Sequence, residues 1–241
     1  MLGLDSPSSV SPVQRETLQD QVYAELRRSL IHGIFPTGEI LRITDLAERL
    51  RTSTMPVREA LRRLVSEQAL EALPNRSVRV PPMTRERLED LARARCLIEG
   101  QVTLLAMPHL SADDFAELRR LTLACEAAFG SRDSATIAAA TELNHAFHYT
   151  IYRAAGSAVL MPLIESLWLQ SGPYVQSAAV LHEEISDPAG THHHWQLIAA
   201  LERQDGAAAV AALNDDISRA FNLIAARLDA EDAEGRAKAN G

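Results

Sequence analysis

Four polar side chains fall on helical faces that otherwise carry apolar residues. Asn144 and His148 are four residues apart, so they share one face of a helix. His194 and Asp216 each line up with apolar positions at helical spacing farther along the chain. A histidine that faces inward needs a hydrogen-bond partner or a metal ion. These four residues are therefore candidates for a buried hydrogen-bond network or a metal site.

Arg95 interrupts another apolar stripe, on a helix expected to begin near residue 85. A guanidinium group keeps its proton, so a buried arginine needs an acidic partner. One partner is Glu99, four residues later on the same helix face. The other is the carboxylate of a bound ligand, which an arginine can hold with two hydrogen bonds. The sequence leaves both partners open.

The N-terminal third of the chain differs in charge from the rest. Residues 1–80 contain 11 arginines and 10 acidic residues, a net charge of +1, whereas residues 81–241 carry a net charge of −9. The chain's total of −8 therefore does not argue against nucleic-acid binding, which depends on a local basic face. Arginine is also this chain's usual basic residue, since only Lys238 is a lysine. The arginines on the segments that would face DNA are Arg49, Arg51, Arg58, Arg62, Arg63, Arg76 and Arg79.

The elements that carry these arginines follow a recognisable order. Apolar residues at helical spacing predict three helices, with Thr44 and Ser53 as N-cap residues of the second and third. Two short β-like runs around a proline-containing turn then predict a hairpin. Helix, helix, turn, helix and hairpin together predict a winged helix-turn-helix. The segments are helices over about 16–32, 45–50 and 53–67, and strands over about 70–73 and 78–80.

After Pro82 the sequence predicts only helices, with Ser111 and Asp114 forming a capping box. A kink or break is expected at the Gly172-Pro173 pair. The fold class is therefore mainly α: a winged helix-turn-helix followed by an all-α bundle of six or seven helices. The expected divisions are a flexible start at 1–15, a DNA-binding domain at 16–80, a linker at 81–84, an effector-binding domain at 85–229 and a flexible tail at 230–241.

Composition limits the setting in which the chain works. Its 241 residues are 46% hydrophobic, enough for two cores. Cys96 and Cys125 form no paired motif, which is typical of a reduced compartment. No apolar run approaches the roughly 18 residues of a membrane helix, and the N-terminus lacks the pattern of a signal peptide. We therefore expect a cytoplasmic protein without a membrane partner.

The helix-turn-helix and hairpin residues resemble those of the GntR family of bacterial regulators. The resemblance rests on Asp45-Leu46-Ala47-Glu48-Arg49-Leu50, on Pro56-Val57-Arg58-Glu59-Ala60-Leu61-Arg62-Arg63-Leu64 and on the hairpin residues 73–80. Arg95 to Glu99, Phe147-His148 and His194 resemble the helical ligand-binding (FCD) domain of the FadR branch. The resemblance implies a homodimeric transcription regulator. It would bind double-stranded operator DNA and respond to a small carboxylate effector.

The resemblance also implies which residues face DNA. The departures from the family pattern include Thr54, which replaces a DNA-contacting arginine, and Arg51, Gln68 and Ser77, which replace glycines. The family's usual operator sequence therefore does not carry over with the resemblance. The expected DNA-binding residues are Arg49, Arg51, Ser53, Thr54, Met55, Arg58, Arg62, Asn75, Arg76 and Ser77.

Metal-binding members of the family use an aspartate and three histidines, and matched positions here are Asn144, His148, His194 and Asp216. These residues would form a more oxygen-rich site for a divalent ion such as zinc, nickel or manganese. The alternative is a polar pocket without metal. The residues expected to bind the effector are Arg95, Asn144, His148 and His194.

Two further hypotheses compete with an effector-controlled regulator. His148, His194 and Asp216 could form the two-histidine, one-carboxylate triad of a metal-dependent oxygenase. The chain has no nucleophile elbow or phosphate loop, and such an enzyme would leave the N-terminal domain unexplained, so we expect no enzymatic activity. The changes at Thr54 and Ser77 instead suggest a ligand-binding module with weakened DNA binding.

Overall fold

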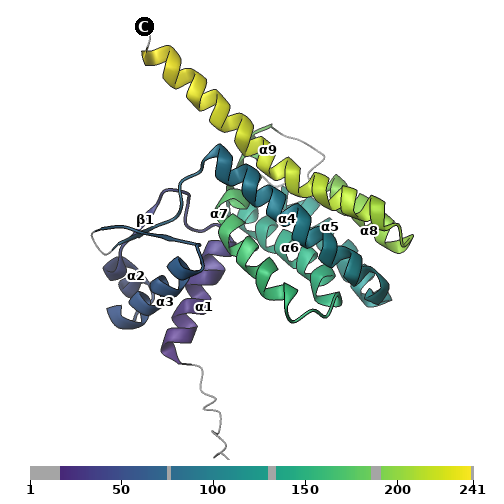
Figure 1. Ribbon diagram of the computed structural model, residues 1–241, viewed down its shortest axis with the longest axis horizontal. Helices are drawn as coiled ribbons and strands as arrows, with labels where there is room; N and C mark the ends of the chain where they lie inside the picture. Colours follow the sequence, from purple (N-terminus) through teal and green to yellow (C-terminus); the bar gives the residue numbers. More distant parts are fainter. Residues whose placement is uncertain (1–16, 75–76, 130–133, 186–190, 240–241) are drawn as a thin grey trace, which may run out of the picture.

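The computed structural model describes residues 17–74, 77–129, 134–185 and 191–239. Helices dominate these ranges, which confirms the predicted fold class. A small head of three helices and a short sheet lies beside a larger bundle of helices (Figure 1). Within the described ranges, every helix is too short or too polar to cross a membrane.

The head begins with α1 (Leu18–Ile31), α2 (Ile43–Arg49) and α3 (Thr54–Ser66). Thr17 caps α1 in a capping box with Asp20. The expected cap at Thr44 is wrong, because this residue lies inside α2 and Arg42 occupies the N-cap position. Ser53 is the N-cap residue of α3, as predicted, although its side chain makes no capping hydrogen bond.

A three-stranded antiparallel sheet completes the head. Its strands are β1 (Ile40–Leu41), β2 (Glu71–Ala72) and β3 (Val78–Arg79), in the order β1-β3-β2. The hairpin of β2 and β3 was predicted, and its register places Glu71 opposite Arg79. The sequence did not predict β1, since two residues are too few to show an alternating pattern.

The bundle contains six α-helices and one short 3-10 helix in the described ranges. These are α4 (Arg85–Ala106), η1 (Met107–His109), α5 (Ala112–Phe129), α6 (Ser134–Ala154), α7 (Leu160–Ile185), α8 (His192–Glu202) and α9 (Gly206–Ala239). The capping box of Ser111 and Asp114 is present at the start of α5. No break occurs at Pro173, which lies inside the continuous α7. The stretch after residue 229 that was expected to be a flexible tail is helical as far as Ala239.

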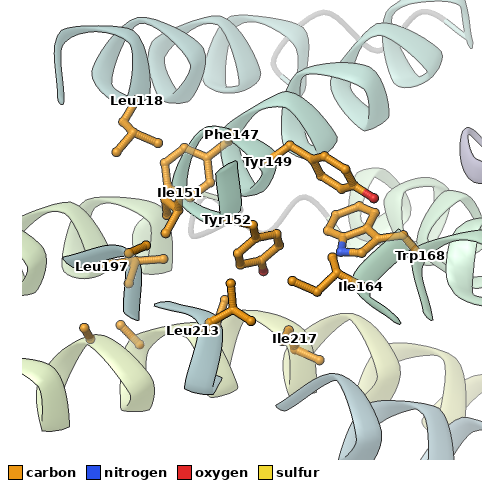
Figure 2. Close-up of a cluster of buried hydrophobic side chains, with 14 of the residues drawn as sticks. Leu118, Phe147, Tyr149, Ile151, Tyr152, Ile164, Trp168, Leu197, Leu213 and Ile217 are labelled. Carbon is orange, nitrogen blue, oxygen red and sulfur yellow. The ribbon is translucent and has the colours of Figure 1, made fainter. Parts of the chain in front are cut away.

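Two clusters of buried apolar side chains form the cores. The larger fills the bundle and includes the aromatic residues Phe147, Tyr152 and Trp168 (Figure 2). The smaller fills the head, and one of its members, Leu169, comes from α7 of the bundle. Since Leu169 is only 1% exposed, the head is packed directly against α7.

Candidate functional site

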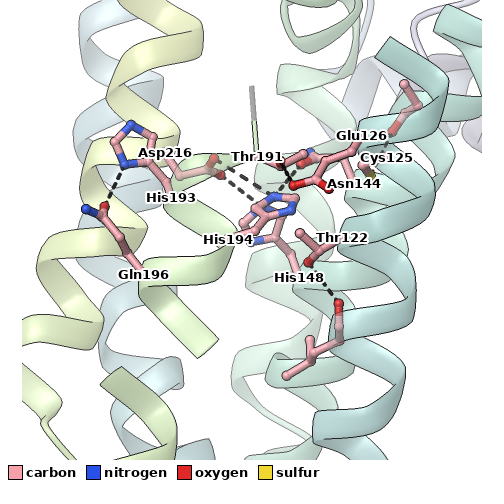
Figure 3. A network of polar contacts seen from close by, with 12 residues as sticks. Thr122, Cys125, Glu126, Asn144, His148, Thr191, His193, His194, Gln196 and Asp216 are labelled. Atoms are coloured by element: carbon pink, nitrogen blue, oxygen red, sulfur yellow. Dashed lines mark hydrogen bonds and ion pairs between the residues drawn. The ribbon is translucent and has the colours of Figure 1, made fainter. Parts of the chain in front are cut away.

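The four polar residues singled out in the sequence come together inside the bundle (Figure 3). His148 Nε2 on α6 lies 3.1 Å from Asp216 Oδ2 on α9. His194 Nε2 on α8 lies 3.1 Å from Asn144 Oδ1 and 3.9 Å from Asp216 Oδ1. Three helices therefore direct two imidazoles, one amide and one carboxylate towards a single point.

Burial holds the two imidazole rings in place. His148 is 1% exposed and His194 is 2% exposed. The His194 ring stacks on Phe147, with ring centroids 3.8 Å apart and planes 9° from parallel. His194 Nδ1 is buried and has no hydrogen-bond partner in the part of the chain that the structure describes. Neither ring has room to turn away, so the directions of their nitrogen atoms are fixed by packing.

Tyr152 determines which nitrogen of His148 carries a proton. Its hydroxyl lies 2.5 Å from Glu99 Oε2 and 3.3 Å from His148 Nδ1. The carboxylate can only accept, so the tyrosine donates its proton to Glu99 and must accept one from His148 Nδ1. In the neutral histidine, Nε2 is then bare and faces the carboxylate of Asp216. Two facing acceptors repel, so this geometry requires a positive charge: a proton on Nε2 or a metal ion between them.

The protonation of the other groups is consistent with cation binding. Burial lowers the pKa of His194 to about 4, so this ring is neutral near pH 7 and can offer a lone pair. Burial alone would raise the pKa of Asp216, but its contacts with the imidazoles of His148 and His194 bring it below its ordinary value. Burial, followed by the charge of Glu99, raises the pKa of Tyr152 well above its ordinary value, so its hydroxyl keeps the proton.

The donor set also fits a divalent ion in size. Ligand atoms about 2.1 Å from one ion lie roughly 3.0–3.4 Å from each other. One ligand atom from each of His148, His194 and Asp216 lies within 4.8 Å of the other two, and the shortest contacts in the cluster are 3.1 Å. The residues present therefore suit a zinc, nickel or manganese ion, with Asn144 as a fourth oxygen ligand.

Arg95 belongs to the same network through Glu99. Its Nε and Nη2 donate to the two oxygens of Glu99 at 2.7 and 3.2 Å, and both side chains are buried. The i+4 partner suggested by the sequence is therefore present. The pair uses two of the three guanidinium nitrogens and leaves Nη1 outside it. The guanidinium also lies 4.3 Å from the ring centroid of Trp168, a favourable cation–π distance.

Sequence reasoning missed several residues that shape this site. Tyr152 follows His148 by four residues, and that spacing is the signal that could have identified it. Glu126 on α5 accepts hydrogen bonds from Thr191 Oγ1 at 2.8 Å and from Trp195 Nε1 at 2.7 Å. These bonds fix the start of α8, and so the position of His194, across a separation of more than 60 residues that no local pattern reveals.

Three of the expected DNA-facing residues line one cavity of the head. A cavity of about 510 Å³ separates α3 from the hairpin, and Arg58, Arg62 and Ser77 contribute to its lining. Arg58 Nε is buried without a hydrogen-bond partner among the described residues, whereas Arg62 pairs with Glu59 at 2.6 Å. The side chain of Arg58 therefore brings to this cavity a buried donor that is still to be satisfied.

Five more of the expected DNA contacts lie around the turn between α2 and α3. All five are exposed: Arg49, Arg51, Ser53, Thr54 and Met55. Asn75 and Arg76, expected at the hairpin tip, lie outside the described residues. Two other arginines of the head have partners, since Arg63 lies 3.6 Å from the Tyr23 ring centroid and Arg79 pairs with Glu71.

Comparison with known proteins gives matches over both parts of the chain. Residues 18–80 match the family model described as bacterial regulatory proteins, gntR family, and residues 90–219 match the FCD domain. The chain is 34% identical over 189 residues to the HTH-type transcriptional regulator McbR of Escherichia coli, covering 77% of this chain and 82% of McbR. It is 31% identical to the repressor GlaR of Escherichia coli, covering 61% and 67% of the two chains.

Solved structures of GntR-type regulators also resemble this chain. The structure of McbR/YncC from E. coli matches with a TM-score of 0.77 and 29% identity, covering 88% of this chain and 99% of that chain. A GntR regulator from Rhodococcus matches with a TM-score of 0.68 at 19% identity, a likeness of fold.

Proposed function

Because the chain belongs to the GntR family of bacterial transcriptional regulators and carries an FCD effector-binding domain, we propose that a small carboxylate effector, bound beside a divalent metal ion, controls its binding to operator DNA. The metal ligands are Asn144, His148, His194 and Asp216. The effector's carboxylate is held by the ion and by Nη1 of Arg95. The observation that carries this proposal is the 3.1 Å contact between His148 Nε2 and Asp216 Oδ2, which needs a positive charge because Tyr152 takes the Nδ1 proton of His148.

The charges of the site favour an anion only when a metal is bound. Arg95 contributes one positive charge, and Glu99 and Asp216 contribute two negative charges, which leaves a net charge of −1. A divalent ion changes this to +1. One carboxylate then neutralises the site, whereas without the ion it would add a second uncompensated negative charge in a buried environment. Metal and effector binding are therefore expected to reinforce each other.

The assembly follows from the way such heads read DNA. Operators with two-fold symmetry are read by dimers whose two recognition helices enter successive major grooves. We take the DNA-binding domain as residues 16–80 and the effector domain as residues 85–229, joined by a linker around Pro81-Pro82. In a homodimer of this chain, the effector would change the spacing of the two heads and so the affinity for the operator.

Metal binding is the first expected result. The full-length protein, stripped with a chelator and titrated with Zn²⁺ in a calorimeter, should bind one ion per chain, with Ni²⁺ and Mn²⁺ titrated in parallel. His148→Ala removes a ligand and should weaken Zn²⁺ binding by about 100-fold or more. Tyr152→Phe removes the acceptor for Nδ1–H and should weaken it by roughly 10- to 100-fold, as is usual for residues that orient a ligand.

His192→Ala is the matched control, because His192 is an exposed histidine at the start of α8. It should leave the Zn²⁺ affinity within about twofold of the wild type, since its ring takes no part in the cluster. A wild type that binds none of the three ions would overturn the metal site. Equal losses in His192→Ala and His148→Ala would do the same.

DNA binding by the head gives a second expected result. Arg58→Ala should weaken binding to a fragment from upstream of the chain's own gene by roughly 1–3 kcal/mol, about 5- to 150-fold, because a groove contact is lost. Gel shifts at fixed low salt measure this change. Arg120→Ala is the control, since Arg120 is exposed on α5 and pairs with Glu117.

The outcome also decides between this function and the module with weakened DNA binding. That alternative rests on Thr54 and Ser77, which replace residues typical of the family's DNA-reading surface. A wild type that retards no upstream fragment at low salt supports the alternative. If Arg58→Ala and Arg120→Ala reduced the retardation equally, the protein would bind DNA through its overall charge. The cavity between α3 and the hairpin would then have no specific role.

A further inference from the structure

One short stretch of α7, residues 165–172, contacts the head and the bundle at the same time. Leu169 lies in the core of the head. Glu165 pairs with Arg27 of α1 at 3.0 Å. The backbone at Gly172 lies so close to α1 that a Cβ atom there would fall 2.1 Å from the carbonyl oxygen of Leu30. Packing this tight leaves no clearance, so α7 and the end of α1 move together or not at all.

Trp168 lies in the same stretch and contacts the candidate site. Its ring is 4.3 Å from the guanidinium of Arg95 and 5.5 Å, between centroids, from His148. Trp168 is 1% exposed and Leu169, the next residue, is equally buried in the other core. Two neighbouring residues of one helix therefore connect the interior of the bundle to the interior of the head.

Helix α6 makes a second connection between the bundle and the head. His148 faces the site, whereas His145, three residues earlier, packs against Trp168 at 5.1 Å and against His32 of the head at 5.6 Å between ring centroids. His32 is the C-cap residue of α1. Burial lowers the pKa of His145 to about 3 and also lowers the pKa of His32. Both rings are thus neutral near pH 7 and act as packing groups between the two cores.

We propose that residues 165–172 of α7 couple the effector site to the DNA-binding head, with Trp168 as the contact on the site and Leu169 and Gly172 as the contacts on α1. The coupling role rests on the proposed function, because it assigns regulation to the same site. The Trp168 ring packs against Arg95 and His148, so an ion or effector that shifts either residue also displaces this ring. The displacement reaches α1 through α7, and α1 packs on the recognition helix α3. Packed interfaces of this kind switch between discrete arrangements rather than deforming continuously.

The proposal predicts that a change on one side of this stretch is detected on the other, even without ligand. Amide hydrogen exchange of the full-length protein measures local opening on each side. Trp168→Leu should increase exchange at residues 30–35 of the head about fivefold or more, the lower end of usual coupling strengths. Trp168→Phe, a milder change, should act in the same direction. Leu169→Ala should in turn increase exchange around Arg95 and His148.

Two controls separate coupling from general loss of stability. Leu118→Ala removes a buried leucine of α5 from the core of the bundle, and Leu46→Ala removes one of α2 from the core of the head. Neither residue belongs to α7, so each should increase exchange in its own domain only. The coupling role is overturned if Trp168→Leu and Trp168→Phe affect residues 30–35 no more than Leu118→Ala does. Equal effects of Leu169→Ala and Leu46→Ala on the site also overturn it.

The same hydrogen-exchange measurement with added Zn²⁺ tests whether ligand binding at the site affects the head. In the wild type, Zn²⁺ should slow exchange at residues 30–35, and Leu169→Ala should abolish this effect while Zn²⁺ affinity stays within about twofold of the wild type. Zn²⁺ that binds without slowing exchange in the head overturns the coupling but leaves the metal site intact. A wild type that binds none of Zn²⁺, Ni²⁺ and Mn²⁺ overturns the metal site, and the ligand-free comparison still decides the coupling.

Discussion

Replacing Glu99 by alanine is expected to lower the free energy of unfolding by about 3–5 kcal/mol, because the substitution leaves a buried positive charge without its partner. Arg95 is 3% exposed and gives two hydrogen bonds to Glu99, which is fully buried. A guanidinium cannot escape this cost by losing its proton. The Tyr152 hydroxyl loses its acceptor in the same variant. Urea denaturation followed by circular dichroism measures the change.

A matched control uses the exposed pair of Glu117 and Arg120 on α5. Glu117→Ala should cost less than about 1 kcal/mol, since water screens both charges of that pair. The double variant Arg95→Met/Glu99→Leu should recover most of the loss caused by Glu99→Ala, because apolar residues of similar volume replace a buried pair at little cost; the Tyr152 hydroxyl still lacks its Glu99 acceptor. If Glu99→Ala lowered the free energy of unfolding no more than Glu117→Ala does, Arg95 would have a second counterion. The net charge of −1 assigned to the effector site would then be wrong.

Arg95 also shows how much of this site could be predicted from the sequence. Its place in an apolar stripe predicted burial, and the i+4 spacing predicted Glu99 as a partner. The spacing alone could not exclude a ligand, because a guanidinium has more donors than one carboxylate uses. The structure gives the Glu99 pair and leaves Nη1 outside it. The two alternatives are therefore compatible, and the ligand role remains a proposal.

The fold was predictable where local patterns are long. Helical spacing and capping signals gave the order of helices and the winged helix-turn-helix, including the capping box at Ser111. Short or distant features escaped. The two residues of β1 carry no period, and the link of Glu126 to Thr191 and Trp195 joins helices that are far apart in sequence. The continuity of α7 through Pro173 depends on packing, which overrides the local tendency of proline to break a helix.

Departures from the family pattern leave a trace in the backbone. Arg51 and Gln68 replace glycines of the family and keep the left-handed conformation that glycine favours, with φ of 51° and 60°. A side chain in this region costs roughly 1 kcal/mol relative to glycine. The turns on both sides of α3 therefore persist because the surrounding structure holds them. Gln68 also has a second role, since its carbonyl oxygen accepts a hydrogen bond from Arg87 of α4 at 3.2 Å.

Gly172→Ala is the second substitution with a large expected effect. A methyl group at this position would lie 2.1 Å from the carbonyl oxygen of Leu30 and 2.5 Å from that of Ile31. Both neighbours are backbone atoms, which cannot turn aside as a flexible side chain can. Helix α7 must therefore move away from α1 and withdraw Leu169 from the core of the head. We expect a loss of roughly 1–3 kcal/mol or more in the free energy of unfolding, the range for overpacked sites.

Gly100→Ala is the control that isolates this steric cause. Gly100 lies inside α4, and a Cβ atom there would meet Val210 at 3.5 Å, an ordinary contact. Alanine at such a helical position should raise stability by about 0.5–1 kcal/mol. Urea denaturation should therefore shift the two variants in opposite directions, although both make the same chemical change inside a helix. Equal shifts would mean that α1 and α7 can separate at little cost. The sequence suggested Gly172 only as part of a kink with Pro173, whereas its close approach to α1 makes it a requirement of the contact between the two domains.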